Sequence, residues 1–207
     1  MTKLRIIFFS FLLITLNLTN TWAKSSTTET IVIFRHAEKP QGGLGQLSCQ
    51  GLNRALALPK ALNAKFGKPD YIFAPDPTVQ AHDSGKAYYY VRPIATIEPT
   101  AIYHEMPINI QYGFGEIDSK SGLASELLSS TYHSSLVFVT WEHSYAVRLA
   151  KEIANATGYE GNIPSWSNDN YDKLYVFTIT WNGSEPNVKF EEQSEGLNNL
   201  SKGCPMM

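Results

Sequence analysis

The stretch "IVIFRHAEKP", residues 31–40, joins an apolar run to a cluster of charged side chains. With Thr30 before it, this run consists of β-branched and aromatic residues, which is typical of a strand buried on both faces of a sheet. Arg35 and His36 follow where the strand is expected to end. Ligands of open α/β sheets bind beyond the carboxyl ends of the strands. The stretch therefore predicts a buried strand over 30–34 that leads into a functional site.

Strand-like and helix-like segments alternate along the rest of the chain. Further strands are predicted over 70–74, 135–141 and 173–181, and helices over 48–67, 122–133 and 144–158. Pro59 is expected to kink the first helix or to start a second helical segment. No repeat or linker divides the chain, so this order predicts a single α/β domain over 30–207. We expect three layers, with a mostly parallel central sheet flanked by helices.

The first 23 residues have the layout of a cleavable secretory signal. Lys3 and Arg5 precede an apolar run over 6–16, and Ala23 provides a small residue at the expected cleavage site. The run is shorter than the ~20 residues that a membrane-spanning helix needs, so an uncleaved anchor is the less favoured alternative. We expect a secreted or periplasmic protein with a loose lead-in over 24–29. It should have no stable membrane insertion after the signal is removed.

Charge and cysteine content restrict the partners of the protein. The formal net charge of -2 gives no electrostatic basis for binding nucleic acid. Export permits a disulfide between Cys49 and Cys204, which would tie the C-terminal tail to the first helix, and two free thiols are the equal alternative. With two cysteines in the chain, a four-cysteine zinc site is excluded.

Two of the histidines follow predicted strands. His36 comes after the strand over 30–34, and Glu142 and His143 come after the strand over 135–141. A neutral imidazole can attack phosphorus when a hydrogen bond holds its other ring nitrogen. An arginine fork can bind two phosphoryl oxygens at once, which suits Arg35 beside His36. Arg92 precedes a proline and is expected at a helix N-terminus, which favours anions. The set predicts phosphoryl-transfer chemistry.

These residues also carry a resemblance to a known family. "RHAEKP" (35–40) resembles the RHG signature of the histidine phosphatase superfamily, which has the phosphoglycerate mutase-like fold. "LSCQGLNRALALP" (47–59), "VFVTWEH" (137–143) and "YDKLYVF" (171–177) are similar to later segments of that family, in the same order. The resemblance implies that His36 is a nucleophile that becomes phosphorylated, and no cofactor is expected. It also implies a set of residues that bind the phosphoryl oxygens: Arg35, Arg92, His143 and, as an additional candidate, Lys39.

The resemblance leaves the proton donor unassigned. Ser144 stands directly after the second histidine, where acid phosphatases of the family carry an aspartate. We predict Glu142 as the donor, on the expectation that the end of its strand relaxes the usual alternation of side chains. Glu116 is the second candidate and Asp118 competes with it, since both lie in "YGFGEIDSKSG" (112–122), whose glycines suggest a mobile loop. The family's usual Ser-Pro lead to the middle arginine is missing, so the path of 74–91 stays open.

The function predicted from these residues is an exported phosphatase that hydrolyses phosphomonoesters through a phosphohistidine on His36. Its substrate is expected to be a phosphorylated small molecule or macromolecule in a shallow pocket, because the segment between Arg92 and His143 is too short for a large helical cap. A mutase is less favoured for an exported protein. One alternative is a catalytically weak module that binds phosphate or a phosphorylated partner. Another is a metal hydrolase built on His36, Glu38, Glu142 and His143, although we expect no metal.

Overall fold

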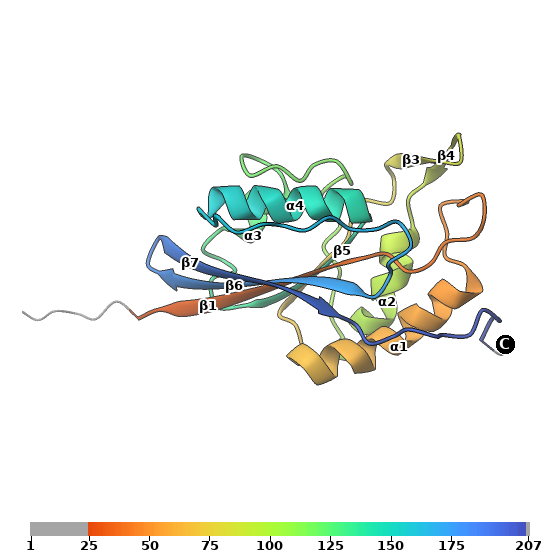
Figure 1. Ribbon diagram of the computed structural model, residues 1–207, viewed down its shortest axis with the longest axis horizontal. Helices are drawn as coiled ribbons and strands as arrows, with labels where there is room; N and C mark the ends of the chain where they lie inside the picture. The colour runs from red at the N-terminus through yellow and green to blue at the C-terminus, as the bar shows by residue number, and fades with distance from the viewer. Residues whose placement is uncertain (1–24, 206–207) are drawn as a thin grey trace, which may run out of the picture.

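A five-stranded sheet forms the centre of the computed structural model, which describes residues 25–205 (Figure 1). The signal predicted over 1–23 lies outside the described residues. The strand order is β2-β5-β1-β6-β7. The strands are β1 (Thr27–Arg35), β2 (Tyr71–Phe73), β5 (Leu136–Trp141), β6 (Lys173–Asn182) and β7 (Glu185–Ser194).

The sheet is mixed, and its strands run mainly in one direction, as expected. β2 and β1 each pair in parallel with β5, whereas β6 is antiparallel to both β1 and β7. β6 therefore runs against the common direction of the other strands. β7 was not predicted, because its sequence "EPNVKFEEQS" alternates exposed and half-buried residues and has no apolar run.

β1 begins earlier than the sequence suggested. Residues 27–29, expected to belong to a loose lead-in, pair with β6 as part of the strand. Glu29 is buried there, and its carboxylate accepts a hydrogen bond of 2.8 Å from Trp181 Nε1. Burial raises the pKa of Glu29 to about 8, so this carboxyl group is mostly protonated at pH 7. The start of β1 could not be predicted, because Glu29 is charged in the sequence and its buried partner, Trp181, lies far along the chain.

Helices cover both faces of the sheet. They are α1 (Cys49–Phe66), α2 (Arg92–His104), α3 (Leu123–Leu127) and α4 (His143–Ala156). α1 continues through Pro59, so no second helical segment starts there, and α3 is much shorter than the helix predicted over 122–133. Figure 1 shows α3 and α4 on one side of the sheet and α1 and α2 on the other.

Two apolar cores result from this arrangement. Ile31 and Ile33 of β1 pack in a cluster with α3 and α4, whereas Val32 and Phe34 pack in a second cluster with α1 and α2. Neighbouring residues of a strand point to opposite faces, so a strand between two helical layers must be apolar throughout. The apolar run before Arg35 is thus explained by the central place of β1.

A separate two-stranded hairpin occupies the segment whose path the sequence left open. β3 (Gln80–Asp83) and β4 (Lys86–Tyr89) are antiparallel and are joined by Ser84 and Gly85, both with positive φ. Two such residues are typical of the tight turns that connect hairpin strands. The hairpin lies at the end of the domain where β1 leads into its following loop (Figure 1). Among residues 25–205, none of the helices is long and apolar enough for a membrane span.

Candidate active site

A cavity of about 470 Å³ lies at the carboxyl ends of β1 and β5. All of the predicted site residues except Glu116 line it: Arg35, His36, Lys39, Arg92, Glu142 and His143. β1 and β5 are neighbours in the sheet, and the backbone N–H of His36 donates to the carbonyl of Trp141 at 2.8 Å. The parallel pairing of these two strands therefore brings the two histidine-containing segments together.

His36 is a buried imidazole with one nitrogen held in place. Its Nδ1 lies 2.8 Å from the carbonyl oxygen of Ala37. A carbonyl can only accept, so in the neutral ring Nδ1 carries the proton and Nε2 is left free for attack. Burial, and then the positive charge of Arg92, lower the pKa of His36 to about 3. The imidazole is therefore neutral at physiological pH, as a nucleophile requires.

The loop after α4 fixes the guanidinium of Arg35. Its NH1 donates to the carbonyl oxygens of Asn168 at 2.8 Å and Asn170 at 3.1 Å, and the group stacks on the ring of Tyr171 at 3.8 Å. Arg35 is buried, and its Nε has no hydrogen-bond partner among the described residues. An arginine held in this way is preorganised to meet an anion in the cavity.

Arg92 is the first residue of α2, directly before Pro93, as the sequence predicted. His143 is the first residue of α4. The positive ends of two helix dipoles therefore lie at the cavity, and helix N-termini favour anions. Thr96 of α2 also accepts a hydrogen bond of 2.9 Å from the backbone N–H of Ala37, which ties α2 to the loop that carries His36.

Asp83 was not among the predicted site residues. Its Oδ1 lies 2.8 Å from Lys39 Nζ, and its Oδ2 accepts from Arg92 NH1. Two of the cationic groups expected to bind phosphate are thus paired with one carboxylate from the β3–β4 hairpin. The dipeptide Ser84-Gly85 between short polar strands was a weak hairpin signal that could have located this segment.

Glu142 lines the cavity, but its carboxylate has a structural role. It caps α4, where Oε2 accepts from the backbone N–H groups of Ser144 at 2.8 Å and Tyr145 at 3.1 Å, and from Ser144 Oγ. Its Oε1 contacts His143 Nδ1. Burial acts to raise the pKa of Glu142, but the interactions with His143 and Ser144 outweigh it and lower this pKa to about 2. An ionised capping carboxylate is poorly suited to the predicted role of proton donor.

The loop over 112–122 does not bring Glu116 to the cavity. Glu116 Oε2 accepts from the backbone N–H of Gly113 at 2.9 Å, within the same loop. Asp118 likewise accepts from the backbone N–H groups of Lys120 and Ser121 at 2.9 and 3.0 Å. From this loop Phe114 lines the cavity instead. Local turn contacts thus hold the carboxylates of both Glu116, the second candidate for proton donor, and Asp118.

Glu38 points away from the two histidines. Arg54 Nε and NH2 donate to its two carboxylate oxygens at 3.0 and 2.8 Å, so this side chain is absent from the cavity lining. Within residues 25–205, no group of three or more His, Cys, Asp or Glu side chains is arranged to hold a metal ion. The four residues considered for a metal hydrolase are thus not assembled around one point.

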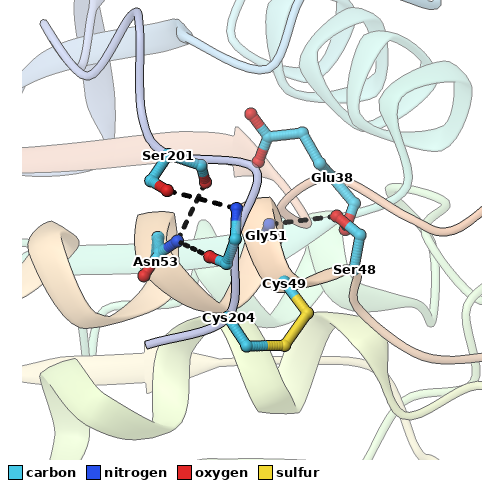
Figure 2. Close-up of a disulfide and its surroundings, with 8 residues drawn as sticks. Glu38, Ser48, Cys49, Gly51, Asn53, Ser201 and Cys204 are labelled. Carbon is cyan, nitrogen blue, oxygen red and sulfur yellow. Dashed lines mark hydrogen bonds between the residues drawn. A yellow bond between two sulfur atoms is a disulfide. The ribbon is translucent and has the colours of Figure 1, made fainter. Parts of the chain in front are cut away.

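Cys49 and Cys204 form a disulfide that ties the C-terminal tail to the start of α1 (Figure 2). Asn53 Nδ2 adds hydrogen bonds to the carbonyl oxygens of Ser201 at 2.9 Å and Gly203 at 2.7 Å. Of the two alternatives that the sequence left open, the paired state is the one found.

Similarity to known proteins is detected through the fold. No protein-family model matches the chain, and no curated protein matches it in sequence. A solved candidate phosphohistidine phosphatase, SixA, from Nakamurella multipartitia is 14% identical, with a TM-score of 0.53 over 80% of this chain and 95% of that chain. The mycobacterial glucosyl-3-phosphoglycerate phosphatase, solved with inorganic phosphate, is 13% identical, with a TM-score of 0.51 over 79% of this chain and 95% of that chain. The chain therefore shares the fold of these solved phosphatases, which is the fold that its motifs predicted.

Proposed function

We propose that the protein is an exported phosphatase that hydrolyses phosphomonoesters through a phosphohistidine intermediate on His36. The observation that carries this proposal is the buried, neutral imidazole of His36, with Nδ1 bonded to a carbonyl and three cationic side chains lining the same cavity. The fold supports it, because one structural neighbour is a glucosyl-3-phosphoglycerate phosphatase and another is a candidate phosphohistidine phosphatase.

The reaction proceeds in two displacements at phosphorus. His36 Nε2 attacks the phosphoryl group, the phosphorus–oxygen bond breaks, and the leaving alkoxide takes up a proton. Water then attacks the phosphohistidine, the phosphorus–nitrogen bond breaks, and inorganic phosphate leaves with the imidazole restored. Arg35, Arg92 and Lys39 offset the charge on the equatorial oxygens, which is the main demand of phosphoryl transfer.

Export is supported by two independent features. Residues 1–23 have the layout of a secretory signal. The disulfide between Cys49 and Cys204 fits an oxidising compartment, because cytosolic reductants keep most thiols reduced. The mature protein should start at residue 24 and occur outside the cytosol. Full-length chain retained in a membrane fraction would contradict this part of the proposal.

The test of the chemistry is a trapping experiment on the mature protein. Brief incubation with a phosphoryl donor labelled at phosphorus, followed by an alkaline quench, should leave an acid-labile, base-stable label on the protein. His36→Ala should abolish both the label and turnover. His82→Ala is the matched control, because His82 lines the same cavity but follows no strand of the central sheet, and it should keep the label. Binding of inorganic phosphate without label or turnover would instead favour the binding module.

A further inference from the structure

The proposed reaction needs a proton donor, and the cavity offers two carboxyl groups. Loss of an alkoxide is slow unless an acid protonates the oxygen as its bond to phosphorus breaks. Among the described residues that line the cavity, the carboxyl groups are those of Asp83 and Glu142. Glu142 is occupied by the N-terminus of α4 and by His143. Asp83 is therefore the remaining carboxyl group that could donate the proton, and this inference rests on the proposed function.

Asp83 differs from Glu142 in the kind of partners it has. The partners of its carboxylate are the side chains of Lys39 and Arg92. Both are cations that a bound phosphoryl group would recruit, whereas the backbone N–H groups that hold Glu142 stay in place when substrate binds. The same two contacts place the Asp83 carboxylate beside two of the cations that line the cavity together with His36.

Substrate binding should reverse the preference of Asp83 for its charged form. Burial acts to raise the pKa of Asp83, but hydrogen bonds from Lys39 and Arg92 hold this pKa below its usual value in the free protein. A phosphoryl dianion that shares these cations neutralises them and adds negative charge nearby. The burial effect and the new repulsion then act in the same direction, so the carboxyl takes up a proton in the complex.

The loop after β1 is shaped to admit the Asp83 carboxylate. A Cβ atom at Gly43 would overlap the carboxylate, and Gly43 has a φ of +75° that favours glycine. The carbonyl of Gly43 also accepts from Arg92 NH1 at 3.5 Å. The glycine loop over 42–45 and the β3–β4 hairpin together hold Asp83 at the cavity.

We propose that Asp83 is the catalytic residue that transfers the proton in both displacements. Its carboxyl group donates the proton to the ester oxygen as the phosphorus–oxygen bond breaks, which leaves a carboxylate and a free alcohol. The carboxylate then takes a proton from the water that attacks the phosphohistidine, as the phosphorus–nitrogen bond breaks. After inorganic phosphate leaves, Asp83 and His36 are back in their starting forms.

The test compares Asp83→Asn on two substrates with different leaving groups. The amide keeps the shape of the side chain and one acceptor for Lys39 or Arg92, but it cannot donate or accept the proton. For an alkyl phosphate, kcat/KM should fall by about 10²–10⁴-fold, the usual contribution of general acid catalysis. For p-nitrophenyl phosphate, kcat/KM should change far less, because this leaving group departs without a proton.

A second readout separates catalysis from folding and positioning. kcat/KM reports the steps up to loss of the leaving group, whereas kcat also includes hydrolysis of the phosphohistidine. With p-nitrophenyl phosphate, Asp83→Asn should therefore accumulate labelled His36 and show a lower kcat than wild type. An unfolded variant would carry no label at all.

Glu142→Gln is the matched control, since it makes the same change on the other carboxyl group of the cavity. It should slow both substrates by similar factors. Equal losses of kcat/KM on both substrates with Asp83→Asn, or selective loss with Glu142→Gln, would overturn the assignment of Asp83. Either result leaves the phosphohistidine itself intact, whereas wild-type protein without label or turnover would contradict the proposed function.

Discussion

The Cys49–Cys204 disulfide should contribute strongly to stability. It joins residues 155 positions apart, so it closes almost the entire domain into one loop. In the chain-entropy description, a loop of this length restricts the unfolded chain by about 5 kcal/mol at 25 °C. Engineered and native disulfides often give less, so we expect Cys204→Ser to lower the free energy of unfolding by about 2–5 kcal/mol.

The assay is urea unfolding at equilibrium, followed by far-UV circular dichroism. Wild type with reductant should match Cys204→Ser without it, and the double variant Cys49→Ser/Cys204→Ser should be no less stable than either single variant. The slope of unfolding free energy against urea should rise, because an uncrosslinked chain exposes more surface. In thermal scans the loss corresponds to about 2–4 °C for each kcal/mol. A change below about 1 kcal/mol with an unchanged slope would refute the reasoning, because it would mean that the bridge does not restrict the unfolded chain.

The cavity supports three more tests. Arg92→Ala should reduce kcat/KM by about 10²–10³-fold, as with loss of one preorganised donor, whereas Arg148→Ala on α4 should leave it near wild type. Gly43→Ala should displace Asp83 and lower kcat/KM toward the value of Asp83→Asn. Gly42→Ala is the control, because Gly42 has a similar positive φ but open space where the Cβ atom would lie. The folded pKa of His36 is about 3 and its ordinary value is 6.5, so unfolded chains bind a proton in this range that the folded protein does not. The free energy of unfolding should therefore fall from pH 7 to pH 5 by about 2 kcal/mol more in wild type than in His36→Asn, as measured by urea unfolding. Equal losses in the two proteins would contradict a neutral buried imidazole.

The strand-end residues of the site could be predicted because their signal is local. An apolar run followed by Arg35 and His36, and another followed by His143, specify both the strands and the edge at which they meet. Asp83 could not be found in this way, because its position depends on a polar hairpin that is held by contacts distant in sequence. Glu142 was assigned the wrong environment for a related reason. Glutamate is not among the residues most favoured at helix N-caps, so its capping role was hidden.

The two edges of the central sheet have a consequence for how the protein behaves at high concentration. An exposed edge strand offers unpaired backbone groups to any other chain, and such edges promote aggregation when they are long and apolar. β2 spans only Tyr71–Phe73, which leaves little to pair with. On the other edge, Pro186 removes one backbone donor from β7, and Lys189 and Glu191 place opposite charges along the strand. A second copy of the chain that paired with β7 would lack one backbone hydrogen bond at Pro186 and would have to cover the charges of Lys189 and Glu191. We therefore expect the concentrated protein not to associate through the edges of its sheet.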